Sequence, residues 1–181
     1  MRRIRQSEFK TAAWKNGGGV THEIARHDDG DVLVWRISLA EVAADGPFSL
    51  FAGLTRVLTV IEGAGVDLHS ANGILAALPL VPVRFSGGTP IDGRLRDGPC
   101  RDVNLIFDAT RIAASASVLR PGGAGNATAL LALAGDVRVG GMPLAPGDFA
   151  WTDRKTVRTG ADGLALMIEL APALRTKATF P

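Results

Sequence analysis

The sequence predicts an all-β protein. Short segments with alternating or β-branched apolar residues recur along the 181 residues, and breaks rich in glycine and proline separate them. The chain has 22 glycines and 10 prolines, which supply many tight turns. Hydrophobic residues make up 46% of the chain, enough for a buried core. Many short strands joined by such turns indicate a β-sandwich or a β-barrel.

The clearest strand of the first half spans residues 32–42. Its odd-numbered residues from 33 to 39 are large and apolar and predict a core face. Arg36 and Ser38 share the other face with valines, so this face is either exposed to solvent or the wall of a pocket. Further strands are predicted at residues 2–9, 20–26, 55–61, 66–69, 83–85 and 102–108. Asp-Gly at residues 29–30 and Asn-Gly at residues 72–73 predict hairpin turns.

The second half continues with short strands. They are predicted at residues 112–119, 127–134, 136–139, 149–152 and 164–170, with glycine-rich or proline-rich breaks between them. Two alanine-rich stretches, residues 71–78 and 109–116, also allow short helices, because alanine is the best helix former.

The two halves share a pattern. In residues 57–65, and again in residues 129–136, an apolar strand ends at a glycine turn. A short strand, a glycine hairpin and a proline-bearing turn follow each time. The second copy closes with Leu-Ala-Pro-Gly-Asp at residues 144–148, which resembles the Pro-x-Gly corner of the cupin barrel. Two such units suggest a bicupin.

In a bicupin, two antiparallel jelly-roll barrels, each a double-stranded β-helix, pack together. We expect residues 1–181 to form a single compact bicupin unit. Its approximate halves are residues 1–110 and 111–181, and the two barrels can exchange strands.

Composition limits the partners and the location. The formal net charge is only +2, and the basic residues are scattered apart from a cluster at residues 1–5, so we expect no nucleic-acid binding. Cys100 is the only cysteine, which excludes an internal disulfide and a CxxC metal site and fits a reducing compartment. No long apolar stretch follows the N-terminus or occurs elsewhere. We therefore expect no signal peptide, no membrane span and a cytoplasmic location.

Three consecutive glycines at residues 17–19 separate Trp-Lys-Asn at residues 14–16 from the next strand. Glycine loses more conformational freedom on folding than other residues, so the run indicates positive φ angles or the close approach of another group. It is either a bulge at a barrel corner or the rim of a pocket. The run lacks the sequence of a phosphate loop and of a dinucleotide-binding turn.

Several motifs, taken in order, resemble the HutD/Ves family. They are Trp-Lys-Asn-Gly-Gly-Gly at residues 14–19 followed by Thr21 and Glu23, Trp-Arg-Ile-Ser-Leu-Ala at 35–40, Gly-Pro-Phe-Ser-Leu-Phe at 46–51, Arg-Val-Leu at 56–58 and Asp-Val-Asn-Leu at 102–105. The motifs cover roughly the first 110 residues. The resemblance implies a small cytoplasmic bacterial bicupin associated with histidine utilisation. It also implies a protein without established catalytic activity that binds a pathway intermediate or a related small anion.

Polar side chains on several predicted strands converge in such a fold, because inward-facing groups from adjacent strands of a barrel meet in one cavity. With the family resemblance, they predict a pocket for a small organic acid. The predicted ligand-binding residues are Trp14, Lys15, Asn16, Gly17, Gly18, Thr21, Glu23, Arg36, Ser38, Arg56, Asp102 and Asn104. Arg36 is expected to pair with the ligand carboxylate. The alternative is that these charges form an internal ion-pair network or face water.

No metal, cofactor or catalytic residue is predicted. The three histidines, His22, His27 and His69, form no His-x-His motif and lie outside both predicted cupin motifs. The usual cupin metal centre, which needs two or three histidines and a carboxylate, is therefore not expected.

Three functions remain open. The first is a non-enzymatic protein that binds a small carboxylate, such as urocanate or a formylated glutamate derivative, and senses or modulates histidine utilisation. The second is a metal-independent cupin enzyme acting on a small organic acid, with Glu23 or Asp102 as general base. The third is an interaction or structural protein whose polar faces are solvated. Exposed strand edges in such a fold are also compatible with a homodimer.

Overall fold

The structure is a computed structural model that describes residues 1–14 and 17–173. Within these residues the chain forms strands and one short 3-10 helix, and it forms no α-helix. Every ladder between the strands is antiparallel. The predicted all-β class is confirmed. None of the described residues lies in a helix that is long and apolar enough to cross a membrane.

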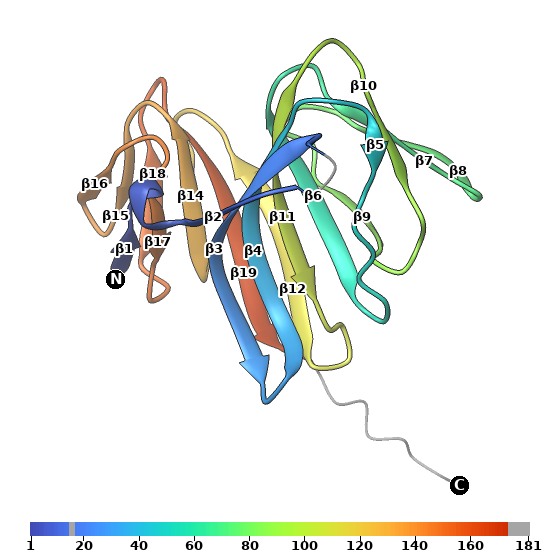
Figure 1. Ribbon diagram of the computed structural model, residues 1–181. Coiled ribbons are helices and arrows are strands. Elements are labelled where there is room, and N and C mark those ends of the chain that lie inside the picture. The colour runs from blue at the N-terminus through green and yellow to red at the C-terminus, as the bar shows by residue number, and fades with distance from the viewer. Residues whose placement is uncertain (15–16, 174–181) are drawn as a thin grey trace, which may run out of the picture.

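The elements follow one another with short turns (Figure 1). In chain order they are β1 (Arg2–Ile4), η1 (Gln6–Glu8), β2 (Lys10–Ala13), β3 (Gly19–Asp29), β4 (Val32–Val42), β5 (Gly46–Pro47), β6 (Thr55–Glu62), β7 (Val66–Ser70), β8 (Gly73–Ala77), β9 (Val83–Ser86), β10 (Asp92–Leu95), β11 (Cys100–Phe107), β12 (Ile112–Leu119), β13 (Ala124–Asn126), β14 (Ala129–Ala134), β15 (Val137–Val139), β16 (Met142–Leu144), β17 (Phe149–Trp151), β18 (Thr156–Thr159) and β19 (Leu164–Pro172).

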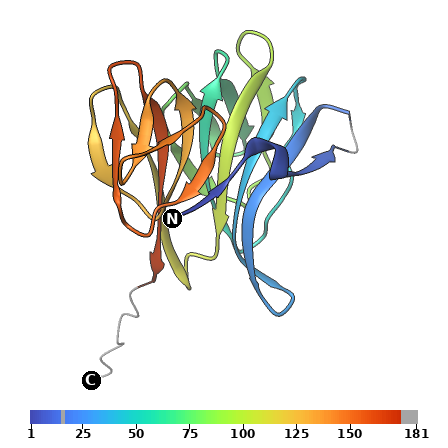
Figure 2. The same cartoon turned by 90° about the vertical axis from the view of Figure 1, so that its left-hand side faces the viewer.

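The strands form four sheets that are arranged as two pairs (Figures 1 and 2). The N-terminal sheet pair consists of a six-stranded sheet, β2-β3-β4-β11-β6-β9, and a four-stranded sheet, β5-β10-β7-β8. The C-terminal sheet pair consists of a five-stranded sheet, β1-β17-β14-β19-β12, and a four-stranded sheet, β13-β18-β15-β16. Strand β1 pairs with β17, so the start of the chain is built into the C-terminal sheet pair.

Three apolar cores hold the sheets together. One lies within each sheet pair, and the third lies between the six-stranded and five-stranded sheets. Trp35 of β4 and Trp151 of β17 meet in the third core, with 5.6 Å between their ring centroids. Strand β4 is therefore buried on both faces: Ile37 and Leu39 enter the core between the sheet pairs, as predicted, whereas Ala40 faces the core of the N-terminal sheet pair.

The longer predicted strands are found close to their expected bounds, and residues 32–42 form β4 with the predicted ends. The strand predicted at residues 2–9 is wrong beyond residue 4, because η1 interrupts it. The sequence pattern does not predict β2, β5, β10, β13, β16 and β18. These strands have two to four residues, which is too short for a two-residue period to become visible.

The two alanine-rich stretches that allowed helices are strands. Residues 73–77 form β8, because the preceding turn folds the chain back along β7. Residues 112–119 form β12, which pairs with β19 along its whole length. The helix propensity of alanine amounts to only a fraction of a kcal/mol per residue, so pairing within a sheet overrides it.

Candidate functional site

A cavity of about 80 Å³ lies inside the N-terminal sheet pair. One water needs about 10–15 Å³ on this measure, so the space suits a few waters or a small metabolite. Strands β3, β4, β6 and β11 and the segment from β5 to β6 form the walls. The lining residues are Trp14, Thr21, Arg36, Ser38, Ala40, Pro47, Phe48, Ser49, Phe51, Arg56, Asp102, Asn104 and Ile106.

Arg56 of β6 lies at the centre of the polar cluster and is buried, with 5% of its surface exposed. Its Nε and Nη2 donate to Asn104 Oδ1 over 3.2 and 2.6 Å, and its Nη1 donates to the carbonyl oxygen of Ser49 over 3.2 Å. Burial lowers the pKa of Arg56 to about 10, while nearby Asp102 raises it and Arg36 lowers it further. Arg56 therefore stays charged at neutral pH, as a fixed cation in the cavity wall.

Three phenylalanine rings surround the guanidinium group of Arg56. The centroids of Phe48, Phe51 and Phe85 lie 5.3, 5.5 and 5.1 Å from its central carbon. At these distances the ring faces attract the cation, and the attraction is stronger where water is excluded. The rings thus compensate in part for the cost of burying the charge.

The network continues along β11. The Oδ1 atom of Asn104 accepts from Arg56, and the Nδ2 atom of Asn104 donates to Asp102 Oδ1 over 2.5 Å. Asp102 is fully buried, and its Oδ2 has no partner among the residues the structure describes. Burial raises the pKa of Asp102 to about 7, although the charge of Arg56 lowers it in part. Because Oδ1 accepts from Asn104, the acid form carries its proton on Oδ2.

Arg36 of β4 is the more accessible arginine, with 22% of its side chain exposed. Its Nε lies 2.9 Å from Glu23 Oε2 on β3, but the N–H direction does not meet hydrogen-bond geometry. Within residues 1–14 and 17–173, its two terminal amino groups have no hydrogen-bond partner. Arg36 therefore forms an ion pair with Glu23 and keeps donors available at the cavity.

Trp14 lines the cavity next to the glycine run. Its Nε1 donates to Thr21 Oγ1 over 2.7 Å. A Cβ atom on Gly19 would lie 2.3 Å from the carbonyl oxygen of Glu41 and 3.1 Å from the Trp14 ring, so only glycine fits there. Gly17 has a φ of +70°, which glycine adopts most easily. The close approach and the positive φ that the glycine run indicated are therefore both found.

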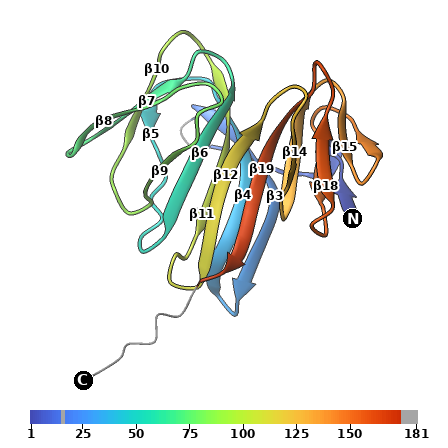
Figure 3. The ribbon, with the colours of Figure 1, turned by 180° about the vertical axis from the view of Figure 1, so that it is seen from behind.

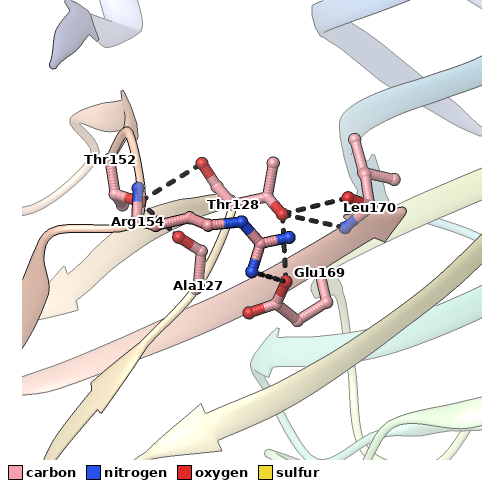
Figure 4. A network of polar contacts seen from close by, with 6 residues as sticks. All are labelled: Ala127, Thr128, Thr152, Arg154, Glu169 and Leu170. Carbon is pink, nitrogen blue, oxygen red and sulfur yellow. Dashed lines mark hydrogen bonds and ion pairs between the residues drawn. The ribbon is translucent and has the colours of Figure 1, made fainter. Parts of the chain in front are cut away.

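The C-terminal sheet pair also has an apolar core, built from alanine, valine, leucine and methionine side chains. Polar contacts of this half form the network in Figure 4, where the turn after β17 meets the segment before β14 and the end of β19. There Thr152 Oγ1 donates to the carbonyl oxygen of Ala127 and accepts from the backbone N–H of Arg154, and Thr128 Oγ1 lies 3.0 Å from Glu169 Oε2. This network closes a turn, and its six residues do not line the cavity described above.

The described residues contain no group of three or more His, Cys, Asp or Glu side chains placed to hold a metal ion. His22 instead lies between two neighbours: its Nδ1 is 2.9 Å from Thr11 Oγ1 and its Nε2 is 3.2 Å from Glu41 Oε1. It thereby links β2 and β4 to β3.

A protein-family model for HutD matches residues 6–167. The chain belongs to the HutD family. It is 38% identical over 112 residues to an uncharacterized 21.2 kDa protein in the hutC 3′ region of Pseudomonas putida. It is 35% identical over 112 residues to protein Ves of Citrobacter koseri. The first alignment covers 60% of this chain and 58% of the Pseudomonas putida protein, and the second covers 58% of this chain and 56% of Ves. This chain therefore spans little more than half of the length of these relatives.

Similar solved structures extend the match over nearly the whole chain. HutD from Pseudomonas fluorescens SBW25, solved in a formate condition, is 31% identical to this chain and superposes with a TM-score of 0.80. The alignment covers 94% of this chain and 98% of that one. PA5104, a conserved protein of unknown function from Pseudomonas aeruginosa PAO1, shares 32% identity with the same TM-score, covering 93% and 97%. A cupin 2 conserved barrel domain protein from Leptotrichia buccalis, at 13% identity, TM-score 0.56 and coverage of 94% and 96%, shares the fold alone.

The cavity of this HutD-family chain brings together seven of the twelve predicted ligand-binding residues: Trp14, Thr21, Arg36, Ser38, Arg56, Asp102 and Asn104. Glu23 forms an ion pair with Arg36 but does not line the cavity. Gly17 and Gly18 do not line the cavity either. Lys15 and Asn16 lie outside the described residues.

The prediction missed the contribution of residues 46–51. Pro47, Phe48, Ser49 and Phe51 line the cavity, and two of them supply rings around Arg56. A signal was present, since Gly-Pro-Phe-Ser-Leu-Phe is one of the family motifs. Only its first two residues form a strand, β5, and in the irregular segment that follows, alternation does not indicate which side chains point inward.

Gly93 of β10 keeps one of these rings in place. A Cβ atom there would lie 2.5 Å from Phe48 Cε1, so Gly93→Ala must displace the ring that packs on Arg56. We expect Gly93→Ala to lower the free energy of unfolding by about 1–3 kcal/mol, the usual cost of overpacking. Urea denaturation measures this. Gly88→Ala is the matched control, because its Cβ would meet nothing closer than 3.6 Å; an equal loss in both variants would contradict the role of Gly93.

Proposed function

We propose that this HutD-family protein binds a small carboxylate in the cavity of the N-terminal sheet pair. One observation carries the proposal: the cavity combines a cation with free donors, Arg36, and a buried acid with an unpaired oxygen, Asp102. A buried polar atom without a partner costs about 1–3 kcal/mol, and a ligand that pairs with it recovers this cost. A carboxylate accepts hydrogen bonds from both groups.

Each polar residue has its own part in the proposed complex. The free amino groups of Arg36 donate to one carboxylate oxygen. Asp102, in its acid form, donates from Oδ2 to the other oxygen. Arg56 contributes charge rather than direct bonds, because Asn104 and Ser49 already accept from its nitrogens. The Trp14 ring and the phenylalanines leave an apolar surface for the rest of the ligand.

The relatives suggest which acids to test. Their descriptions connect the family with the hut genes, which supports a ligand from histidine utilisation, such as urocanate or a formylated glutamate derivative. We propose that the protein acts in the cytoplasm and senses or modulates this pathway without converting the ligand. The two sheet pairs and the cupin-like neighbour support a bicupin architecture. The proposed ligand site is the cavity of the N-terminal sheet pair.

Arg36→Ala tests the site directly. We expect it to weaken binding of the best ligand by roughly 10- to 100-fold, because a charge-assisted hydrogen bond contributes about 1.5–3 kcal/mol. Isothermal titration against a panel of histidine-pathway acids, from formate to urocanate and formylglutamate, measures the change. Arg111→Ala is the control, since this exposed arginine pairs with Asp29 outside the cavity. Equal affinity of Arg36→Ala and wild type would exclude Arg36 as the carboxylate partner.

The raised pKa of Asp102 also supports a second candidate, a metal-independent enzyme that acts on the same class of acid. A carboxyl group with a pKa of about 7 inside a cavity can both accept and donate a proton near neutral pH. If the protein is such an enzyme, NMR should detect a product formed from one of the panel acids, and Asp102→Asn should abolish the formation of this product. Binding without any product supports the non-enzymatic function.

A further inference from the structure

Strand β8 forms an open edge of the N-terminal sheet pair. It pairs only with β7, and the hairpin of β7 and β8 projects from the body of the molecule (Figures 1 and 3). An edge strand presents backbone N–H and C=O groups along its free side, and these groups can pair with another strand.

The side chains of β8 make this edge apolar. Ile74 is 65% exposed and Leu75 is 37% exposed, and Leu78 and Val81 follow at 40% and 47%. Four of the seven large hydrophobic residues exposed in the described chain therefore lie within residues 74–81. Residues 70–83 include no charged residue and no histidine. Leu75 also borders an open hollow of about 410 Å³, which extends the apolar surface beside the strand.

The other described sheet edges carry the protection that natural proteins use against pairing. Charged residues occur on β1, β2 and β9, and a proline interrupts β5 and β16. β13 has only three residues, and β12 contacts β11 and β6 of the other sheet pair. Among the edges in residues 1–14 and 17–173, β8 and β12 have five or more residues, no charge and no proline; β12 lies against strands of the other sheet pair, whereas β8, apart from its partner β7, approaches only β6 of its own sheet pair.

We propose that β8 pairs antiparallel with β8 of a second copy of this chain, joining two four-stranded sheets across a two-fold axis. An uncharged strand offers no charge pattern with which to select a different partner, whereas a two-fold axis places the same apolar strand opposite itself. An axis through Leu75 sets Ile74 beside Ala76 of the second copy, a large residue against a small one. The two Leu75 side chains then meet at the hollow. This dimer is independent of the proposed carboxylate site.

Light scattering after size exclusion tests the proposal. We expect the wild-type protein to have twice the 18.9 kDa mass of the chain, and Ile74→Lys to have half the wild-type mass with an unchanged circular dichroism spectrum. Lysine on an edge strand opposes pairing. Met142→Lys is the matched control, because Met142 is 54% exposed on another edge strand, and it should remain a dimer. A monomeric wild type, or equal masses of the two variants, would overturn the proposal.

Cross-linking places the axis without depending on the folding of Ile74→Lys. The natural Cys100 is buried, so a short bismaleimide should join two chains of Leu75→Cys and should not join two chains of Met142→Cys. Equal cross-linking of both variants, or none in Leu75→Cys, would exclude pairing through β8.

Discussion

Arg56→Ala is expected to lower the free energy of unfolding by about 3–5 kcal/mol, the scale found when one partner of a buried ionic network is removed. The substitution leaves the oxygens of Asn104 and Ser49 without their donor. It also removes the cation that three phenylalanine rings surround. Urea denaturation followed by circular dichroism measures the loss.

Arg84→Ala is the matched control for Arg56→Ala. Arg84 also stacks on a phenylalanine, with its guanidinium carbon 5.1 Å from the Phe107 centroid, but it is exposed, and its hydrogen bond to the carbonyl oxygen of Ala114 is long, at 3.5 Å. We expect a loss of at most about 1 kcal/mol. Similar losses in the two variants would show that Arg56 contributes no more than a surface arginine.

Asp102 should make carboxylate binding dependent on pH. Its pKa of about 7 means that the acid form, which can donate from Oδ2, is lost as pH rises through neutrality. We expect the affinity for a carboxylate to fall about tenfold per pH unit above pH 7, hence about a hundredfold by pH 9, because one proton is linked to binding. Isothermal titration at several pH values measures the slope.

Asp102→Asn should remove this dependence, since an amide stays neutral and still offers a donor. We expect its affinity to be constant from pH 6 to pH 9 and to exceed that of the wild type at the alkaline end. A wild-type affinity that does not change with pH would contradict donation by Asp102. A slope that persists in Asp102→Asn would assign the titration to another group.

The same raised pKa affects folding. Between about pH 4 and pH 7, the folded state retains the Asp102 proton that the unfolded chain has lost. The free energy of unfolding should therefore fall as pH rises through this window, and it should fall less in Asp102→Asn.

The sequence alone determined the fold class and the sides of the long strands. Side chains alternate in a strand, so the pattern of residues 32–42 placed Ile37 and Leu39 on one face and Arg36 and Ser38 on the other. The family motifs, read with these faces, selected twelve residues, and seven of them line one cavity.

Only the tertiary structure decided what each face meets. Alternation cannot distinguish a face that meets water from one that meets a second sheet, and β4 is buried on both sides because a sheet packs on each. Contacts between distant segments, which local patterns do not encode, placed the phenylalanines around Arg56, left Asp102 Oδ2 unpaired and joined β1 to β17. They also made β8 a strand at an open edge, where the alanines of residues 71–78 had allowed a helix. Burial, which sets the pKa of Asp102 and the energetics of Arg56, is a property of the packed sheets.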